Sequence, residues 1–300
     1  MMSPEIWTIK ELLRVTGEFL GRKGIDNPRL SAEILLGHQL QMTRVDLYLN
    51  FDRPLDGSEI AGYRSLIKRR LNREPIQYIT GRQEFWSLDF VVGPQTLIPR
   101  PESELLVEEA LRLIRQRDSG KQPGIMLLDL GTGCGALAVS IATEIAEASI
   151  WASDISQAAL DLAVLNAKRH GVESRIEFLC GDLWEPFMTL RIGFDIILSN
   201  PPYIASDAIN SLMPEVRIHE PLLALDGGVE GMRLIERIVS EGADYLNPGG
   251  WLLVEMDPEQ TPAALSLIDS TGRYGDRGRI KDYSHRCRVV MAQKRHDQVE

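Results

Sequence analysis

The sequence has few of the residues that cross-link a protein or hold a metal ion. Its three cysteines are an odd number, lie far apart and include no Cys-x-x-Cys pair, and the five histidines form no ligand-spaced cluster with them. We therefore expect neither a disulfide framework nor a metal site. No segment approaches the roughly 18 consecutive apolar residues of a membrane span, and the first residues lack the basic and apolar regions of a secretion signal. These absences predict a cytoplasmic protein that does not engage a membrane.

The sequence also has fewer basic than acidic residues. The chain has 33 Lys and Arg against 43 Asp and Glu, a net charge of −10, which repels phosphate over most of the surface and disfavours direct nucleic-acid binding. The charge is unevenly placed, because residues 1–85 carry +2 and the remaining residues carry −12. This asymmetry predicts a boundary near residue 85, and 300 residues are enough for about two domains with separate cores.

The first domain, residues 1–83, is predicted to be a small helical bundle. Apolar residues repeat there at helical spacing, and no strand pattern interrupts them. Three helix starts are marked by N-cap residues, namely Thr8 with Glu11, Asn27 with Pro28, and Asp56 with Glu59. Gly21 is expected to end the first helix. The basic residues between 64 and 73 scatter around their helix, which favours an ordinary solvated surface, with partner docking as the alternative.

Residues 84–99 are predicted to form a β-hairpin linker, because aromatic and β-branched residues flank the turn signal Gly93-Pro94. Beyond it, over residues 100–293, short apolar runs alternate with helical stretches, as in an α/β fold with a doubly wound, mostly parallel sheet. The expected strands are Ile125–Leu130, Ser149–Ser153, Ile176–Leu179, Asp195–Ser199 and Trp251–Glu255. A last pair, Ile280–Tyr283 and Arg288–Ala292, is expected to add an antiparallel edge, and residues 294–300 a loose tail.

A glycine-rich loop follows the first of these strands, at Gly131–Ala136. Glycines at such a position let backbone N–H groups approach a ligand at the start of a helix. Asp154 lies about 20 residues further on, where a carboxylate accepts hydrogen bonds from ribose hydroxyls of either NAD or S-adenosylmethionine. Asp129, just before the loop, favours S-adenosylmethionine, because a carboxylate suits a cationic amino-acid group and repels a pyrophosphate.

Two further residues near the strand ends have both a functional and a structural interpretation. Asp182, at the end of the third strand, lies where an adenine amino group would be bound, with Leu183 covering the ring; the alternative is a cap or turn residue. Cys134 is interpreted as a small loop residue without a redox role.

The fourth strand ends in Asn200-Pro201-Pro202-Tyr203. Each proline restricts the residue before it, so that Asn200 and Pro201 are held at the carboxyl edge of the sheet, where ligands of such sheets bind. The Asn200 side-chain oxygen and the Pro201 carbonyl can accept the two protons of a planar –NH₂ group, while Tyr203 stacks on its plane. The nitrogen is then aligned with a methyl donor by positioning and electrostatics rather than by a strong base.

These motifs carry a family resemblance. Asn200–Tyr203 together with Asp129–Gly133 resembles the class I methyltransferases that modify planar amino groups. Pro75–Gly81, Glu84-Phe85 and Leu97–Glu104 look like segments of one family among them, the peptide chain release factor N5-glutamine methyltransferases (PrmC, or HemK). The resemblance extends from about residue 5 to residue 292. It departs from the usual pattern at Ser103, where threonine is usual, and at His285, where glycine is usual.

The resemblance implies a substrate, a cofactor and a set of site residues. The substrate of this family is the glutamine of the Gly-Gly-Gln loop in class 1 release factors, and the helical domain helps to dock that protein. S-adenosylmethionine would be bound by Asp129, Gly131, Thr132, Gly133, Cys134, Gly135, Asp154, Asp182, Leu183 and Asn200. The glutamine amide would be held by Asn200, Pro201, Pro202 and Tyr203, of which Asn200, Pro201 and Tyr203 act in catalysis. We expect a monomer that needs no metal.

Two alternatives stay open at this point. An adenine-N6 methyltransferase acting on DNA or RNA would use the same Asn-Pro-Pro-Tyr motif, because the exocyclic amine of adenine is also a planar –NH₂. A non-catalytic binding module or an NAD-dependent oxidoreductase would use the same glycine loop.

Overall fold

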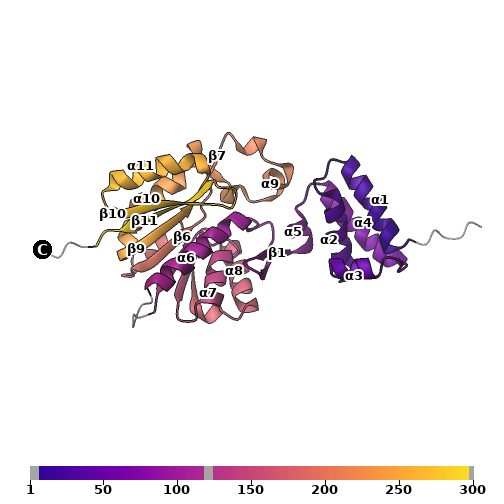
Figure 1. Cartoon of the computed structure of the whole chain (residues 1–300), viewed down its shortest axis with the longest axis horizontal. Coiled ribbons are helices and arrows are strands. Elements are labelled where there is room, and N and C mark those ends of the chain that lie inside the picture. Colours follow the sequence, from indigo (N-terminus) through magenta and orange to yellow (C-terminus); the bar gives the residue numbers. More distant parts are fainter. Residues whose placement is uncertain (1–6, 118–123, 297–300) are drawn as a thin grey trace, which may run out of the picture. The chain divides into compact units, whose positions relative to one another are not determined.

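The computed structural model describes residues 7–117 and 124–296, and the chain divides into two compact units (Figure 1). The first unit comprises Met1–Arg82 and Met213–His219, and the second comprises Gln83–Leu212 and Glu220–Glu300. Each unit has its own hydrophobic core. The division at Arg82 lies close to the predicted change of charge, whereas the assignment of Met213–His219 to the first unit was not expected from the sequence.

The first unit is helical throughout. Its helices are α1 (Ile9–Arg22), α2 (Pro28–Leu40), α3 (Arg44–Leu49), α4 (Gly57–Leu71), α5 (Ile76–Thr80) and α9 (Pro214–His219). The predicted capping boxes at the starts of α1 and α4 are present, and a third at Thr43 and Asp46 starts α3. The core of this unit includes isoleucine and leucine side chains from α1 and α2 together with residues of α3, α4 and α5, such as Leu47, Tyr63 and Ile79.

Two details of the helix ends differ from the sequence prediction. Asn27 precedes α2 in the left-handed region, with φ of 47°, and its side chain makes no capping hydrogen bond. Asn27 is thus the N-cap residue as predicted, and its carbonyl accepts from the Ser31 N–H at 2.9 Å, but its side chain does not cap the helix. Pro28 occupies the first turn as expected. Gly21 lies inside α1, which continues to Arg22, and the chain turns at Gly24 with φ of 68°.

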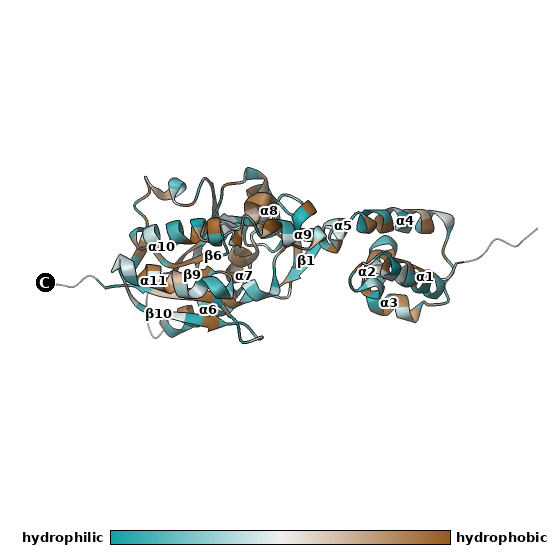
Figure 2. Ribbon diagram, turned by 90° about the horizontal axis from the view of Figure 1, so that it is seen from above, coloured by the Kyte–Doolittle hydropathy of each residue, from teal (hydrophilic) through white to brown (hydrophobic). Residues whose placement is uncertain are grey.

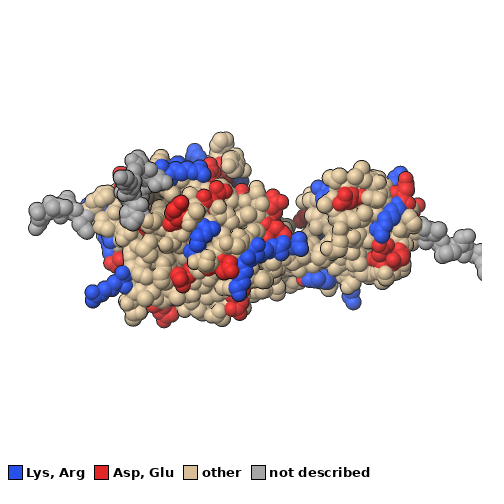
Figure 3. Space-filling model, turned by 90° about the horizontal axis from the view of Figure 1, so that it is seen from below, with Lys and Arg blue, Asp and Glu red and all other residues tan. Residues whose placement is uncertain are grey.

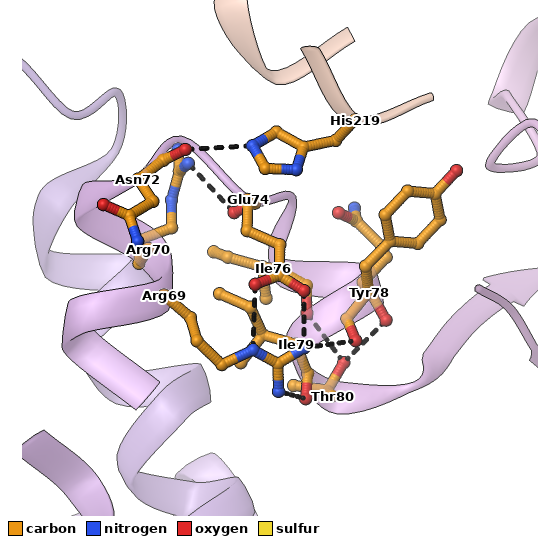
Figure 4. A network of polar contacts seen from close by, with 10 residues as sticks. Arg69, Arg70, Asn72, Glu74, Ile76, Tyr78, Ile79, Thr80 and His219 are labelled. Carbon is orange, nitrogen blue, oxygen red and sulfur yellow. Dashed lines mark hydrogen bonds and ion pairs between the residues drawn. The ribbon is translucent and has the colours of Figure 1, made fainter. Parts of the chain in front are cut away.

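The basic residues near the end of α4 are partly structural. Arg69 donates to the Glu74 carboxylate at 2.8 Å and to the carbonyls of Tyr78 and Ile79 at 3.3 and 3.4 Å, which ties α5 to the end of α4 (Figure 4). Arg70 is only 5% exposed. A solvated surface is therefore the wrong description for Arg70.

The second unit begins with a hairpin of β1 (Arg82–Phe85) and β2 (Leu88–Val91). The turn between them is made by Trp86 and Ser87, both left-handed with φ of 53° and 58°, as a two-residue hairpin turn requires. The predicted turn at Gly93-Pro94 is present, because the Thr96 N–H donates to the Gly93 carbonyl at 3.1 Å, but it follows the hairpin and does not connect its two strands. The hairpin turn at Trp86 and Ser87 could not be predicted from the sequence, because neither tryptophan nor serine is typical of a left-handed position.

A seven-stranded sheet forms the centre of the second unit. Its strands are β3 (Met126–Leu130), β4 (Ser149–Asp154), β5 (Ile176–Cys180), β6 (Phe194–Ser199), β9 (Leu246–Glu255), β10 (Tyr274–Lys281) and β11 (Cys287–Lys294). They lie in the order β10-β11-β9-β6-β3-β4-β5. β11 is antiparallel to both its neighbours, and the other pairs are parallel. This is the predicted doubly wound, mostly parallel sheet with its antiparallel strand near one edge.

Helices cover both faces of this sheet. They are α6 (Glu104–Arg117), α7 (Ala136–Glu144), α8 (Gln157–Arg169), α10 (Arg233–Tyr245) and α11 (Thr261–Thr271). Figure 1 shows α10 and α11 together on one side and α6, α7 and α8 together on the other. In Figure 2, α4 and α10 mix hydrophilic and hydrophobic colours as amphipathic helices do. Within the described residues, no helix combines the length and apolarity needed to span a membrane.

Several short elements of the second unit lie outside the seven-stranded sheet. Two-residue β7 (Ile204–Ala205) pairs with β8 (Asp226–Gly228), and a 3-10 turn, Pro101–Ser103, precedes α6. The predicted loose tail, 294–300, starts at the last residue of β11, and residues 297–300 lie outside the described part of the chain.

The strand register brings three chain segments to one edge of the sheet. Asp129 of β3 is directly opposite Ala152 of β4 on one side and Leu198 of β6 on the other. Asp154 and Asn200 each come two residues later, so Asp154 is the last residue of β4 and Asn200 directly follows β6. The strand order reverses at β3, which is where open α/β sheets bind their ligands.

Candidate active site

The glycine loop connects β3 to α7. The N–H groups of Gly131 and Thr132 donate to the Ser153 carbonyl of β4 at 2.8 and 2.9 Å. Gly135 precedes α7 with φ of 83°, and a Cβ there would lie 3.2 Å from the Ala163 Cα of α8. Only glycine fits both this backbone conformation and this close approach. The loop therefore places the N-terminus of α7 against the open edge of the sheet.

Asp129 lies beneath this loop and is completely buried. Its Oδ2 accepts hydrogen bonds from the Thr132 hydroxyl at 2.6 Å and the Ala138 N–H at 3.1 Å. Its Oδ1 is buried and has no hydrogen-bond partner among the described residues. Burial raises the pKa of Asp129 to about 6, against the opposing effect of these two hydrogen bonds. The carboxylate thus holds a charge that the surrounding residues only partly compensate.

Asp154 ends β4 and contacts the loop directly. Its Oδ2 accepts from the Gly133 N–H and its Oδ1 from the Ser156 N–H, each at 2.9 Å. Burial raises the pKa of Asp154, and these backbone donors lower it. The carboxylate is fixed beside the glycine loop, where the sequence predicted a ribose-binding group.

Asp182 and Leu183 follow β5, and Leu183 has a left-handed backbone with φ of 46°. The Asp182 Oδ2 accepts from Arg237 of α10 at 2.8 Å, a contact that the sequence did not reveal. Both side chains are about 41% exposed, so this ion pair contributes little to stability. Its role is to hold the Asp182 carboxylate at the edge of the site.

Asn200 lies directly after β6, and its side-chain Nδ2 donates to the Ser103 hydroxyl oxygen at 2.9 Å. This contact occupies the donor end of the amide and leaves Oδ1 available as an acceptor. The preceding residue, Ser199, donates its hydroxyl proton to the Leu130 carbonyl at 2.7 Å. The chain is thereby fixed to the end of β3 just before the two prolines.

Tyr203 is placed differently from its neighbours. Its ring packs against the core that α10 and α11 form with the sheet, and its hydroxyl lies 3.4 Å from Oε1 of Glu255 at the end of β9. Its carbonyl accepts from Gln260 at 2.8 Å, and burial raises the pKa of the phenol.

Most of these residues line one cavity of about 630 Å³. This volume is within the range of small-molecule sites. The predicted site residues that line it are Gly131, Thr132, Gly133, Cys134, Asp154, Asp182, Leu183, Asn200, Pro201 and Pro202. Asp129, Gly135 and Tyr203 are not among the lining residues. The cavity therefore brings the glycine loop and the Asn-Pro-Pro segment together in one space.

Several lining residues carry no motif that sequence reasoning could have used. They include Gln95, Thr96, Leu223, Arg233 and Arg237. Glu220 fixes the linker beside the cavity, because its Oε1 accepts from Arg100 at 2.6 Å and its Oε2 from the Ile98 N–H at 3.2 Å. The only sequence signal for Glu220 is that Glu220-Pro221 also looks like a segment of the methyltransferase family that the motifs resemble, which implies a support for the loop.

Asn166 of α8 is a second support that the sequence did not single out. It is fully buried, donates to the Cys134 carbonyl at 2.9 Å, and exchanges two hydrogen bonds with the backbone of Val91. It therefore connects the hairpin to the glycine loop. Burial also raises the pKa of the Cys134 thiol to about 12, so this cysteine is not a thiolate nucleophile at neutral pH.

Comparisons with known proteins identify the family. The PrmC N-terminal domain model matches residues 11–81, and the methyltransferase small domain model matches residues 111–228. A release factor glutamine methyltransferase of Geobacter sulfurreducens is 45% identical over 269 residues, covering 90% of this chain and 91% of the relative. The chain belongs to the release factor glutamine methyltransferase family. It is therefore a methyltransferase, as the motifs predicted.

Other members and solved structures agree with this assignment. The release factor glutamine methyltransferase of Rhodopirellula baltica is 38% identical over 291 residues, covering 96% of this chain and 97% of its own. The N-terminal domain of human METTL16, solved with SAH, has a TM-score of 0.53 at 17% identity and covers 71% of this chain and 77% of that one. This likeness confirms the class I methyltransferase fold of the second unit.

Proposed function

We propose that this methyltransferase transfers a methyl group from S-adenosylmethionine to the side-chain amide nitrogen of a release factor glutamine, in the Gly-Gly-Gln loop of class 1 factors. The observation that carries the proposal is that Asn200, Pro201 and Pro202 line the same cavity as the glycine loop. The substrate nitrogen and the methyl donor would therefore occupy adjoining parts of one space. The family names of the relatives point to the same substrate.

The residues of the loop fit S-adenosylmethionine. Asp154 and the N-terminus of α7 face the cavity at the loop, and the unpartnered Oδ1 of Asp129 leaves a buried negative charge next to the lining residue Leu130. A cationic amino-acid group would offset that charge, whereas a pyrophosphate would add to it. When bound, S-adenosylmethionine supplies an electrophilic methyl group on a sulfonium.

Asn200 would act on the glutamine by accepting one of its amide protons. Its Nδ2 is engaged by Ser103, so Oδ1 is the atom that faces a substrate donor. The Pro201 carbonyl would accept the second proton, and together they would fix the nitrogen toward the donor. The Tyr203 hydroxyl contacts Glu255, and Tyr203 is not among the lining residues; its stacking on the substrate amide stays a prediction.

Nucleic acid is the less favoured substrate. Figure 3 shows acidic side chains beside the basic ones on the face in view, and the chain carries a net charge of −10. The relatives are named for a release factor substrate, so the adenine-N6 alternative has less support. We infer that the protein binds no nucleic acid directly.

The docking unit, the oligomeric state and the cellular location are also part of the proposal. The helical unit would dock the release factor, as the family resemblance implies. We infer that the protein acts as a monomer, as expected from the sequence. Cys134, Cys180 and Cys287 are free, which fits the reducing conditions of the cytoplasm.

A transfer assay tests this function. Purified enzyme, labelled S-adenosylmethionine and a release factor should give one methyl group on the Gly-Gly-Gln glutamine, located by mass spectrometry, and a release factor with that glutamine replaced by alanine should stay unlabelled. Asn200→Ala should abolish transfer, whereas Asp276→Asn, at an exposed position in β10, should not. A release factor left unlabelled by the wild-type enzyme would refute the proposal.

A further inference from the structure

One glutamine side chain joins three separate loops beside the Asn-Pro-Pro-Tyr segment. Gln260 ends the 3-10 turn Pro258–Gln260, directly before α11, and is half-buried. Its Nε2 donates to the Tyr203 carbonyl at 2.8 Å and to the Glu230 carbonyl at 2.9 Å, and its Oε1 accepts from the Asp257 N–H at 3.0 Å. The amide therefore makes three hydrogen bonds, two as a donor and one as an acceptor.

The contact with Asp257 determines which end of this amide faces the two carbonyls. A backbone N–H can only donate, so the Gln260 oxygen must face the Asp257 N–H. Asp257 in turn accepts from the Glu259 N–H at 2.9 Å, as part of the capping box of this turn. With the oxygen engaged there, the N–H donors of Gln260 face Tyr203 and Glu230.

The loops of Tyr203 and Glu230 are also in close backbone contact. A Cβ at Gly231 would lie 2.0 Å from the Tyr203 carbonyl oxygen, and only glycine allows this approach. Glu230 is left-handed, with φ of 53°, a conformation that persists only where the surrounding structure holds it. The hydrogen bond from Gln260 to the Glu230 carbonyl supplies part of that hold.

The two prolines of the segment need an anchor of this kind. Proline has no backbone N–H, so neither Pro201 nor Pro202 can donate a hydrogen bond that would fix the segment. In the proposed function the Pro201 carbonyl accepts a proton of the substrate amide, so this carbonyl is not available as an anchor. The chain is held before the prolines at Asn200 and after them at Tyr203, where Gln260 binds the carbonyl.

We infer that Gln260 is a positioning residue for methyl transfer, which fixes the Tyr203 carbonyl and through it the direction of the Pro201 carbonyl. This inference rests on the proposed function of the Asn-Pro-Pro-Tyr segment. Gln260 is not among the residues that line the cavity, so it acts through Tyr203 and does not touch the reacting atoms. The turn before α11 thereby has a part in aligning the substrate nitrogen with the methyl donor.

A kinetic test separates alignment from folding. Gln260→Met removes the amide at nearly constant length and should lower kcat by about 10- to 100-fold, the range expected when a reacting group is misplaced. The Kd for S-adenosylmethionine should change by less than about twofold, because the glycine loop is untouched. Gln260→Glu, which keeps the acceptor for the Asp257 N–H and loses both donors, should be slowed to a similar extent.

The matched control is a second half-buried glutamine in the same unit. Gln293 of β11 donates from Nε2 to the Gly249 carbonyl at 2.8 Å, so Gln293→Met loses the same kind of hydrogen bond and should keep the wild-type kcat. A wild-type kcat in Gln260→Met, or an equal loss of kcat in Gln293→Met, would overturn the inference. A loss of S-adenosylmethionine affinity as large as the loss of kcat would overturn it as well.

A spectroscopic test does not depend on activity. In protein labelled with ¹³C at the tyrosine carbonyls, the Tyr203 signal is the one of seven that is lost in Tyr203→Phe. This signal should shift in Gln260→Met, which loses the hydrogen bond, and not in Gln293→Met, and an unshifted signal in Gln260→Met would overturn the inference. A wild-type enzyme that labels no release factor would overturn the proposed function instead, while the Tyr203 signal would still decide whether Gln260 holds the carbonyl.

Discussion

Arg70 of α4 donates from Nη2 to Oε1 of Glu215 in α9 at 2.9 Å, across 145 residues of sequence. Both side chains are nearly buried, at 6% and 10% exposure. Burial raises the pKa of the Glu215 carboxyl. The backbone hydrogen bond and the guanidinium groups of Arg70 and Arg73 lower this pKa by more, so that it lies below its ordinary value. This pair holds Met213–His219 within the helical unit, together with the hydrogen bond from His219 to the Asn72 carbonyl (Figure 4).

Loss of one partner of this pair should destabilise the helical unit. Arg70→Met leaves Glu215 buried without its main partner, and we expect a loss of about 3–5 kcal/mol in the free energy of unfolding. The double variant Arg70→Met with Glu215→Met should recover most of the loss. Because a lowered carboxyl pKa stabilises the folded state only while the group is ionised, the wild-type advantage should disappear as the pH falls below the ordinary pKa of glutamate. Urea unfolding at pH 7 and at pH 3.5 measures both effects, and equal stability of wild type and Arg70→Met at pH 7 would contradict this account.

Asp129→Asn should separate cofactor binding from stability. The pKa of Asp129 is raised to about 6, so the folded protein binds its proton more tightly than the unfolded chain and loses stability as the pH rises toward and through 6. Asparagine removes this dependence, so the melting temperature should vary less between pH 5 and pH 8 than in wild type.

The same substitution should weaken S-adenosylmethionine binding by about 10- to 100-fold, the cost of losing an interaction with a charged group. Calorimetric titration measures this change. Asp276→Asn, at an exposed position in β10, should alter neither the affinity nor the pH dependence. Unchanged affinity in Asp129→Asn would exclude a role for this charge in cofactor binding.

Glu255 should give the stability of the protein a pH dependence below neutrality. Burial raises the pKa of Glu255 to about 7, so the folded protein binds this proton more tightly than the unfolded chain does. The free energy of unfolding should therefore fall as the pH rises toward and through 7, and Glu255→Gln should reduce this fall. Urea unfolding between pH 5 and pH 8 measures the difference, and the same pH dependence in both proteins would count against a raised pKa for Glu255.

His285 should be replaceable by glycine with a gain in stability. Its backbone is left-handed, with φ of 63°, in a turn where Asp282 accepts from the N–H groups of Ser284 and Arg286. The left-handed region costs a non-glycine residue roughly 1–2 kcal/mol, partly offset by the greater freedom of glycine in the unfolded chain. We expect His285→Gly to raise the free energy of unfolding by about 0.5–1 kcal/mol, with His285→Ala giving no such gain. Chemical denaturation of the three proteins measures the difference.

The sequence was most informative where one short segment determines its own structure. The capping boxes at Thr8 and Asp56 need only residues three apart, and the strands buried on both faces, such as Phe194–Ser199, are visible as continuous apolar runs. The glycine loop and the Asn-Pro-Pro segment could be placed at one edge because parallel strands end on the same side.

It was least informative where a contact joins distant segments. The hydrogen bond from Asn200 to Ser103 joins residues that are 97 apart in the sequence. Glu220 accepts hydrogen bonds from Ile98 and Arg100, which are 122 and 120 residues away. No local sequence pattern marks these contacts. Tyr203 shows the same limit, because its place beside Glu255 rather than on the cavity wall depends on how β9 ends. Left-handed residues such as Trp86 were missed because their conformation is imposed by the hairpin and not by their own preference.

The most direct test of the central claim is to follow a labelled methyl group from S-adenosylmethionine in the presence of both a release factor and adenine-containing nucleic acid. The account predicts label on the Gly-Gly-Gln glutamine alone, and loss of that label in Asn200→Ala while S-adenosylmethionine still binds. Label on adenine, or full transfer by Asn200→Ala, would contradict it.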